Sequence, residues 1–364
     1  RTILSEIPVL VIRTETADIN QCKITKNTSR FHNEIVKQRL SCIPIYVKPA
    51  QFSNFTDNYR LVLDVKNDSN IEILWVTTDD FRIQEKNTNQ FLNKEEVLKM
   101  FPHDILTQRP IDFLRLRPSM GITEGEHIQL SAEFSISQAK ENGMFNVVNK
   151  CSFHNVIDAE SRENAWEIQL QTMKNENITD EEIEFERKNF HCLDGYRYYK
   201  KNENGEANEF EFIVQTISAY SNYEVMYHSC NILEKKFKAF VQNVQSAIVP
   251  IHPSHESREL GYTSVTVSTI ENCYDIILEN EDYTFGYILE HFLYSMFYLQ
   301  NEEENSMTFV GFKKYHPHDN YSVIRMAFEK ETTAQILLKQ YLVKACIETS
   351  TTFESLKQKF STFV

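Results

Sequence analysis

The amino-acid sequence predicts an α+β fold in which two similar helix-and-strand units pack as a pseudo-dimer within one chain, around a β-rich insert domain. Three observations predict this fold. The chain has 364 residues, more than a single compact domain normally uses. Apolar residues alternate with a period of two over 111–117 and 127–136, as half-buried strands do. They recur at helical spacing over 225–248 and 285–297.

The first part of the chain combines a helix stub with β-rich runs. Residues 1–7 carry an apolar helical pattern that Pro8 ends, so we expect an N-terminal strand and most of a helix to precede this sequence. Further patterns predict a helix over 31–40 and strands over 59–65 and 71–76. The charged stretch 158–190 suits surface helices or a mobile connection.

The last part of the chain changes period. A strand is predicted over 210–214, and a long amphipathic helix follows until Pro250 stops it. The polar stretch 251–259 suits a linker. The second unit is predicted to contain strands over 262–270, 273–279, 307–312 and 322–328, a helix over 285–297 and a terminal helix over 333–359.

These elements predict the following domain organisation. The first dimerisation half comprises 1–12 and 209–250, the insert domain 13–208, the linker 251–260 and the second dimerisation half 261–364. Each half presents a helix face too broad for a free surface helix, so the two halves are expected to bury these faces against each other.

Composition disfavours several classes of function. Only 8 residues are glycine, and neither a phosphate-binding P-loop nor a dinucleotide-binding glycine motif occurs. The formal net charge of −14 disfavours broad binding to nucleic-acid phosphates, and no apolar run approaches the length of a membrane span. The 7 cysteines are scattered without a C-x-x-C pair, which favours a reducing compartment over zinc ribbons or disulfides.

Several motifs occur in a specific order. In the first part these are RTILSEIP (1–8), NTSRFHNEIVKQRLSCIPI (27–45), WVTTDDF (75–81) and LRPSMGITEGEHIQLSA (116–132). The C-terminal part contains ENEDYTFGYIL (279–289) and FVGFKKYHP (309–317). The ordered set resembles the RNA polymerase assembly family, which contains the bacterial α subunit, the archaeal D and L subunits, and the third and eleventh subunits of eukaryotic RNA polymerase II.

The resemblance covers almost the whole chain, and it places third-subunit-like motifs before eleventh-subunit-like ones. It implies an RNA polymerase α-like dimerisation module made within one chain. It further implies a non-catalytic platform on which the second-largest and then the largest subunit of a DNA-directed RNA polymerase assemble. Small zinc-binding subunits are a further class of partner that the resemblance leaves open.

No cofactor is expected in this chain, because the family places the catalytic magnesium in the largest subunit. No membrane contact and no sequence-specific nucleic-acid contact are expected either. A fusion of two subunits resembles the arrangement in large cytoplasmic DNA viruses, which implies the host cytoplasm and the virion. A cellular origin would imply the nucleus.

Two sets of residues are predicted to matter. The interface between the halves is predicted to place Phe285, Ile288, Leu289, Phe292 and Leu293 against Ile232, Leu233, Phe237 and Phe240. In the second set, Asp282 or Thr284 can cap the following helix, and Gly286 would let a neighbouring backbone approach its first turn. A plain helix cap with no further role is an equal interpretation of Asp282.

Other chemistry receives less support from the sequence. The histidine pairs His252/His255 and His316/His318 could each supply half of a metal site, but no third ligand is indicated. Cys151 and His154 are near each other in sequence, yet no orienting group or oxyanion site accompanies them. Two alternative functions therefore stay open: a virion scaffold protein that retains the fold, and an enzyme with an unrecognised site in the insert domain.

Overall fold

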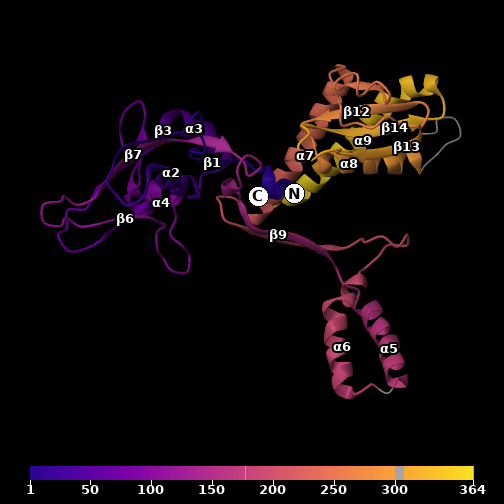
Figure 1. The fold of residues 1–364 in the computed structure, drawn as a ribbon, viewed down its shortest axis with the longest axis horizontal. Coiled ribbons are helices and arrows are strands. Elements are labelled where there is room, and N and C mark those ends of the chain that lie inside the picture. Colours follow the sequence, from indigo (N-terminus) through magenta and orange to yellow (C-terminus); the bar gives the residue numbers. More distant parts are fainter. Residues whose placement is uncertain (177, 300–306, 364) are drawn as a thin grey trace. The chain divides into compact units, whose positions relative to one another are not determined.

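A computed structural model describes residues 1–176, 178–299 and 307–363 (Figure 1). The chain forms two compact units, one made of 1–147 together with 217–364 and the other of 148–216. The segment 13–208, expected as one insert domain, is therefore shared between both units. Helices and small antiparallel sheets alternate along the chain, which confirms the α+β class.

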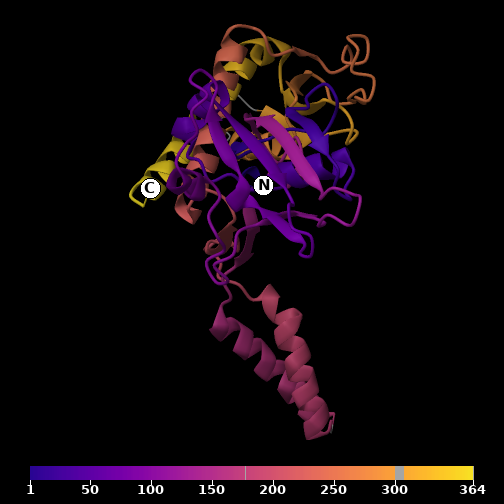
Figure 2. The same cartoon turned by 90° about the vertical axis from the view of Figure 1, so that its left-hand side faces the viewer.

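Residues 13–134 fold around an antiparallel sheet with the order β2 (Cys22–Asn27), β7 (His127–Glu133), β3 (Tyr59–Lys66) and β5 (Arg82–Glu85). Along β7 the predicted alternation is confirmed, because Ile128, Leu130 and Ala132 are buried while their neighbours are partly exposed. Figure 2 shows this region from another side. The remaining elements here are α2 (Asn33–Ser41), α3 (Phe52–Asn58), α4 (Lys94–Met100), and the pair β4 (Leu74–Thr77) and β6 (Asp112–Leu116).

The C-terminal half contains a second antiparallel sheet with the order β11 (Ile251–Pro253), β12 (Cys273–Glu279), β14 (Tyr321–Phe328) and β13 (Met307–Lys313). One face of it packs on helices α8 (Tyr283–Leu293) and α9 (Glu331–Ser361), as Figure 1 shows. The alternation of β12 explains this layering: Ile276 and Leu278 face the helices, and Ile277 faces the other side.

Two predictions for this half are wrong. Residues 251–253 form an edge strand paired with β12 and do not belong to a linker. Residues 262–270 form no strand, although their apolar residues alternate. Tyr262 and Val265 instead lie on the open face of the sheet, against Ile277 and Val323, so burial explains the pattern without any strand pairing.

The helix α7 (Asn222–Gln245) confirms the predicted long amphipathic helix, and a capping box between Ser221 and Glu224 fixes its start. The N-terminal residues form a short helix, α1 (Thr2–Ser5), followed by β1 (Val9–Val11), which pairs with β8 (Ser135–Ser137). After α8 the chain continues as one π-helical turn, Tyr294–Tyr298. Single 3-10 turns lie at Pro49–Gln51, Thr78–Asp80, Gly143–Phe145 and Asp194–Arg197.

The second unit is a two-stranded ribbon with a helical hairpin. The ribbon pairs β9 (Val148–Asn155) with β10 (Phe210–Thr216), and the hairpin consists of α5 (Ala159–Asn175) and α6 (Asp180–Cys192), side by side in Figure 2. The hairpin confirms the predicted surface helices and has a small core of its own around Trp166, Met173 and Phe190. The strand expected in the first dimerisation half, 210–214, belongs to this unit. No described helix is long and apolar enough to cross a membrane.

A buried ion pair fixes the irregular segment 254–268 to the C-terminal sheet. Asp275 is fully buried on β12, and Arg325 on β14 binds both of its carboxylate oxygens, at 2.7 and 3.0 Å. The second carboxylate oxygen also accepts a hydrogen bond from Ser257, and Arg325 donates to the carbonyl oxygen of Thr266. These two hydrogen bonds between segment 254–268 and the sheet therefore both depend on the Asp275–Arg325 pair.

Replacing Arg325 with methionine should lower the free energy of unfolding by about 3–5 kcal/mol, because it leaves the Asp275 carboxylate buried without its cation. Urea unfolding followed by circular dichroism measures the loss. The matched control is Arg187→Met, which breaks an exposed pair with Glu163 and should cost less than about 1 kcal/mol. Similar losses in both variants would contradict this role of Asp275.

Candidate functional site at the packing of α7 on α8 and α9

Aromatic rings from both halves of the chain meet at the centre of the C-terminal core. Phe237 of α7 is fully buried and stacks on Phe285 of α8, with ring centroids 4.3 Å apart and an interplanar angle of 13°. Phe240, about one turn further along α7, contacts the edge of the same ring at 5.2 Å. A helix that lies before the C-terminal sheet in sequence thus supplies part of that sheet's core.

The structure brings most of the predicted interface residues together. Phe237, Phe240, Phe285, Leu289 and Leu293 are buried in one apolar cluster, and Ile288 and Phe292 are partly buried against it. Leu233 is buried on α7, whereas Ile232 is only partly buried.

The main partner of α7 is nevertheless α9, which the sequence reasoning missed. The packing of α7 along α9 is the most extensive helix–helix contact among the described residues. The helical spacing of six buried residues along α9 is the pattern from which its packing could have been predicted. These residues are Leu338, Tyr341, Leu342, Ala345, Cys346 and Thr349. Half of this stripe consists of small or weakly apolar residues, so its hydrophobic pattern is faint. Burial raises the pKa of the Cys346 thiol well above its ordinary value.

Charged residues tie α7 to α9 beside this core. Glu234 is buried on α7 and accepts hydrogen bonds from Lys238, at 2.6 Å, and from Lys357 of α9. Burial by itself would raise the pKa of Glu234, but the hydrogen bonds from the two lysines outweigh it and lower the pKa. The carboxylate is therefore held ionised where α7 crosses α9.

A second charged cluster joins three segments that are distant in sequence. Lys236 of α7 lies 2.9 Å from Glu6, just after α1, and 3.3 Å from Glu281, just before α8. Burial raises the pKa of Glu281 even though Lys236 opposes the shift. The pKa of Lys236 is also raised: burial would lower it, and the two carboxylates more than compensate.

Asp282 is the residue that caps α8. One of its carboxylate oxygens accepts the backbone N–H of Thr284 at 3.2 Å, and the other accepts the Arg1 guanidinium at 2.8 Å. Of the two predicted capping residues, Asp282 therefore supplies the side chain and Thr284 only its backbone amide. The Asp282 carboxylate also holds Arg1, the residue before α1, against the start of α8.

The space beside Gly286 is filled by a side chain from a neighbouring strand. The prediction that a neighbouring backbone approaches there is wrong. A Cβ atom at this position would lie 2.0 Å from the nearest ring atom of Phe312 on β13. Edge-on contacts of the Phe312 ring with Tyr287 and Tyr283, at 5.0 and 5.8 Å, hold it there. Glycine is required because this ring occupies the space of a side chain.

The remaining candidates do not form reaction centres. Cys151 and His154 point to opposite faces of β9, because they are three positions apart on the strand, and His154 lies 3.2 Å from Glu211. His252 is buried and stacks on Tyr262, and burial lowers its pKa. Within residues 1–176, 178–299 and 307–363, no group of three or more His, Cys, Asp or Glu side chains is placed to hold a metal ion.

No family model matches the chain, and no curated protein matches its sequence.

Replacing Lys236 with methionine should lower the free energy of unfolding by roughly 1–3 kcal/mol at about pH 8, because Glu6 and Glu281 then lose the cation that they share. The pKa of Glu281 is already raised, so acidification towards about pH 4 protonates it and should shrink this loss. Thermal unfolding across this pH range measures both effects. Adding Glu281→Gln should recover much of the loss, and the exposed control Lys188→Met should show little change. A loss independent of pH would contradict this account.

Replacing Gly286 with alanine should destabilise the chain by about 1–3 kcal/mol, since the added methyl group collides with Phe312. Helix propensity alone predicts the opposite change, because alanine favours a helix over glycine by roughly 1 kcal/mol. A loss of stability would therefore report the collision. Urea unfolding of a double-mutant cycle with Phe312→Ala tests the contact, and the penalty should largely vanish in the Phe312→Ala background. Gly143→Ala, which adds a methyl group in open space, is the matched control. Additive effects of the two substitutions would refute the contact.

Proposed function

We propose that this chain is a non-catalytic assembly-platform subunit of a multisubunit DNA-directed RNA polymerase, which nucleates association of the two largest subunits. In this proposal the chain is an RNA polymerase α-like dimerisation module in which both halves belong to one polypeptide. Residues 1–12 and α7 contribute the first half, and the sheet with α8 and α9 contributes the second.

One observation carries the proposal: motifs far apart in the sequence contact each other in the structure. Arg1 of RTILSEIP binds Asp282 of ENEDYTFGYIL, and Glu6 shares Lys236 with Glu281. In the C-terminal half, Phe312 of FVGFKKYHP fills the space left open by Gly286 of ENEDYTFGYIL. These contacts support the proposal because they join three of the quoted motifs at the start of α8.

In this proposal, different chains of the polymerase carry out different parts of transcription. The two largest subunits would bind template DNA, and the largest would carry the catalytic magnesium. This chain would present protein-binding surfaces, which suits its formal net charge of −14 because such a charge repels nucleic-acid phosphates.

Affinity purification of the tagged full chain from the cells that naturally produce it tests the proposal. The expected result is stoichiometric co-purification of two much larger chains, identified by mass spectrometry as the two largest polymerase subunits. The double variant Leu289→Asp/Phe292→Asp should lose soluble expression or both partners, because Leu289 is fully buried and Phe292 packs against the same cluster. The control His291→Asp changes an exposed position of the same helix and should retain them.

Two outcomes would refute the proposal, and a third would refute only the predicted interface between the halves. Recovery of the wild-type chain with virion structural proteins alone would favour the scaffold alternative. A lone chain with hydrolytic activity would favour an enzyme. Normal incorporation of the Leu289→Asp/Phe292→Asp variant into polymerase would show that the apolar core between the halves is not needed for assembly.

A further inference from the structure

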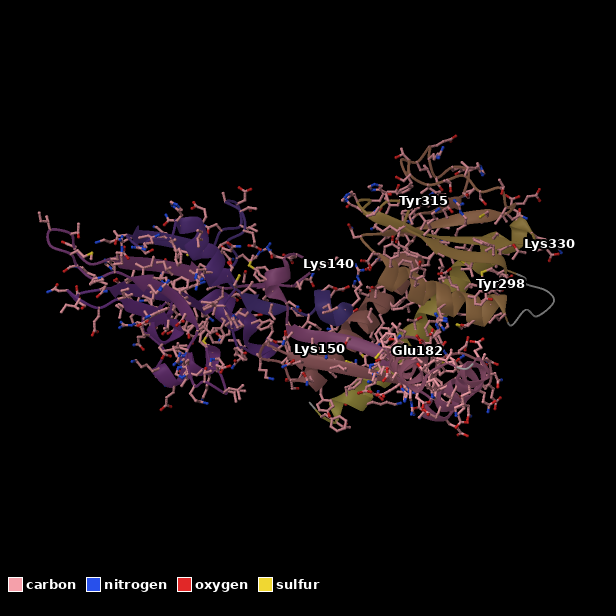
Figure 3. All side chains as sticks on the ribbon, turned by 60° about the horizontal axis from the view of Figure 1, so that its bottom comes forward. Lys140, Lys150, Glu182, Tyr298, Tyr315 and Lys330 are labelled. Atoms are coloured by element: carbon pink, nitrogen blue, oxygen red, sulfur yellow. The ribbon has the colours of Figure 1, made fainter. Side chains whose placement is uncertain are left out.

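The ribbon of the second unit is amphipathic, and its apolar face is exposed. In the β9–β10 register Phe212 lies opposite Phe153, Val214 opposite Cys151 and Phe210 opposite Asn155. Paired residues of an antiparallel sheet point to the same side, so these six side chains share one face. We call it the ribbon face. The opposite face carries polar residues, among them Lys150 (labelled in Figure 3) and the His154–Glu211 pair.

Three phenylalanines of the ribbon face form one aromatic cluster in contact with solvent. Phe153 stacks on Phe212 at 5.8 Å and contacts Phe210 at 6.3 Å. Their exposed fractions are 65% for Phe153, 57% for Phe212 and 47% for Phe210. Scattered exposed apolar residues are normal, but an ordered aromatic cluster on the apolar side of a sheet is typical of a binding surface.

The hairpin of the same unit does not supply the missing layer. Trp166, Met173 and Phe190 pack with one another in a separate cluster between α5 and α6. An isolated two-stranded ribbon is marginally stable in water and normally needs a further layer on its apolar face. The helices of its own unit therefore leave the ribbon face uncovered.

Charge indicates which kind of molecule provides this layer. Residues 148–216 contain fifteen Asp and Glu against eight Lys and Arg, a net charge of −7, which is half of the −14 of the whole chain. Much of this charge lies on the hairpin, where Glu182 is labelled in Figure 3. Such a field repels a second copy of the unit, nucleic acid and anionic lipid, and it attracts a basic protein surface.

We propose that the ribbon face docks one of the two largest polymerase chains through a basic surface that carries apolar side chains. This inference rests on the proposed function and assigns a specific surface to it. The phenylalanines supply the buried contact, and the acidic hairpin accelerates the encounter. Binding is therefore expected to be sensitive both to loss of the rings and to ionic strength.

The test uses the full tagged chain and the double variant Phe153→Ser/Phe212→Ser. Serine removes the aromatic contact without adding charge, and the circular dichroism spectrum of the purified variant should match that of the wild type. In the same affinity purification, the variant should retain roughly tenfold less of one or both largest subunits than the wild type. The matched control is Phe185→Ser on α6, which alters an equally exposed phenylalanine (63%) outside the ribbon face. It should retain both subunits.

Each other outcome overturns the inference. If the wild-type chain captures the two subunits and the double variant captures them equally well, the proposed function stands and the ribbon face is not the docking surface. If the wild type captures neither subunit, the function and the inference both fail. Two further results assign the face to another occupant: a dimer of the chain that the double variant abolishes, or binding of single-stranded RNA that needs Phe153. If capture of the large subunits does not weaken as the salt concentration rises, the proposed electrostatic role of the acidic hairpin is contradicted.

Discussion

The stacking of Phe237 on Phe285 is the contact on which the C-terminal half depends. The helix α7 precedes the C-terminal sheet in sequence, yet its apolar stripe completes the core formed by that sheet, α8 and α9. Without α7, the inner surfaces of α8 and α9 would expose an apolar area that soluble proteins rarely tolerate. The helix α7 and the C-terminal sheet with α8 and α9 are therefore interdependent, and this dependence supports the proposed pseudo-dimer.

Charged contacts determine the position of α7 relative to its neighbouring helices. Glu234 faces α9, while Lys236 faces the ends of α1 and α8, so each side of the helix has its own partners. Apolar packing alone tolerates small shifts along a helix, whereas a buried carboxylate without its cation is costly. These pairs thus select one arrangement among several that the apolar stripe would allow. At the start of α8, Gly286 and the Phe312 ring fix the distance between helix and sheet in the same selective way.

Much of this architecture could be predicted from the sequence, and the failures have local physical reasons. The helical spacing of α8 and α7 placed Phe285, Leu289 and Phe237 correctly in the core, because large apolar residues define those stripes. The stripe of α9 escaped notice because alanine, cysteine and threonine fill much of it. Residues 262–270 alternate like a strand, but periodicity reports burial and cannot show whether a pairing partner exists. For the same reason the pairing of β10 with β9 could not be read from either strand alone.

The most direct test of the central claim is to divide the chain between Ala247 and Ile248, after α7 and before β11, and to co-express the two pieces with a tag on one. The account predicts that 1–247 and 248–364 co-purify as a one-to-one complex, because α7 in the first piece completes the core of the second. Phe237→Asp in the first piece should abolish the complex. Separate purification of two soluble, folded pieces would contradict the account.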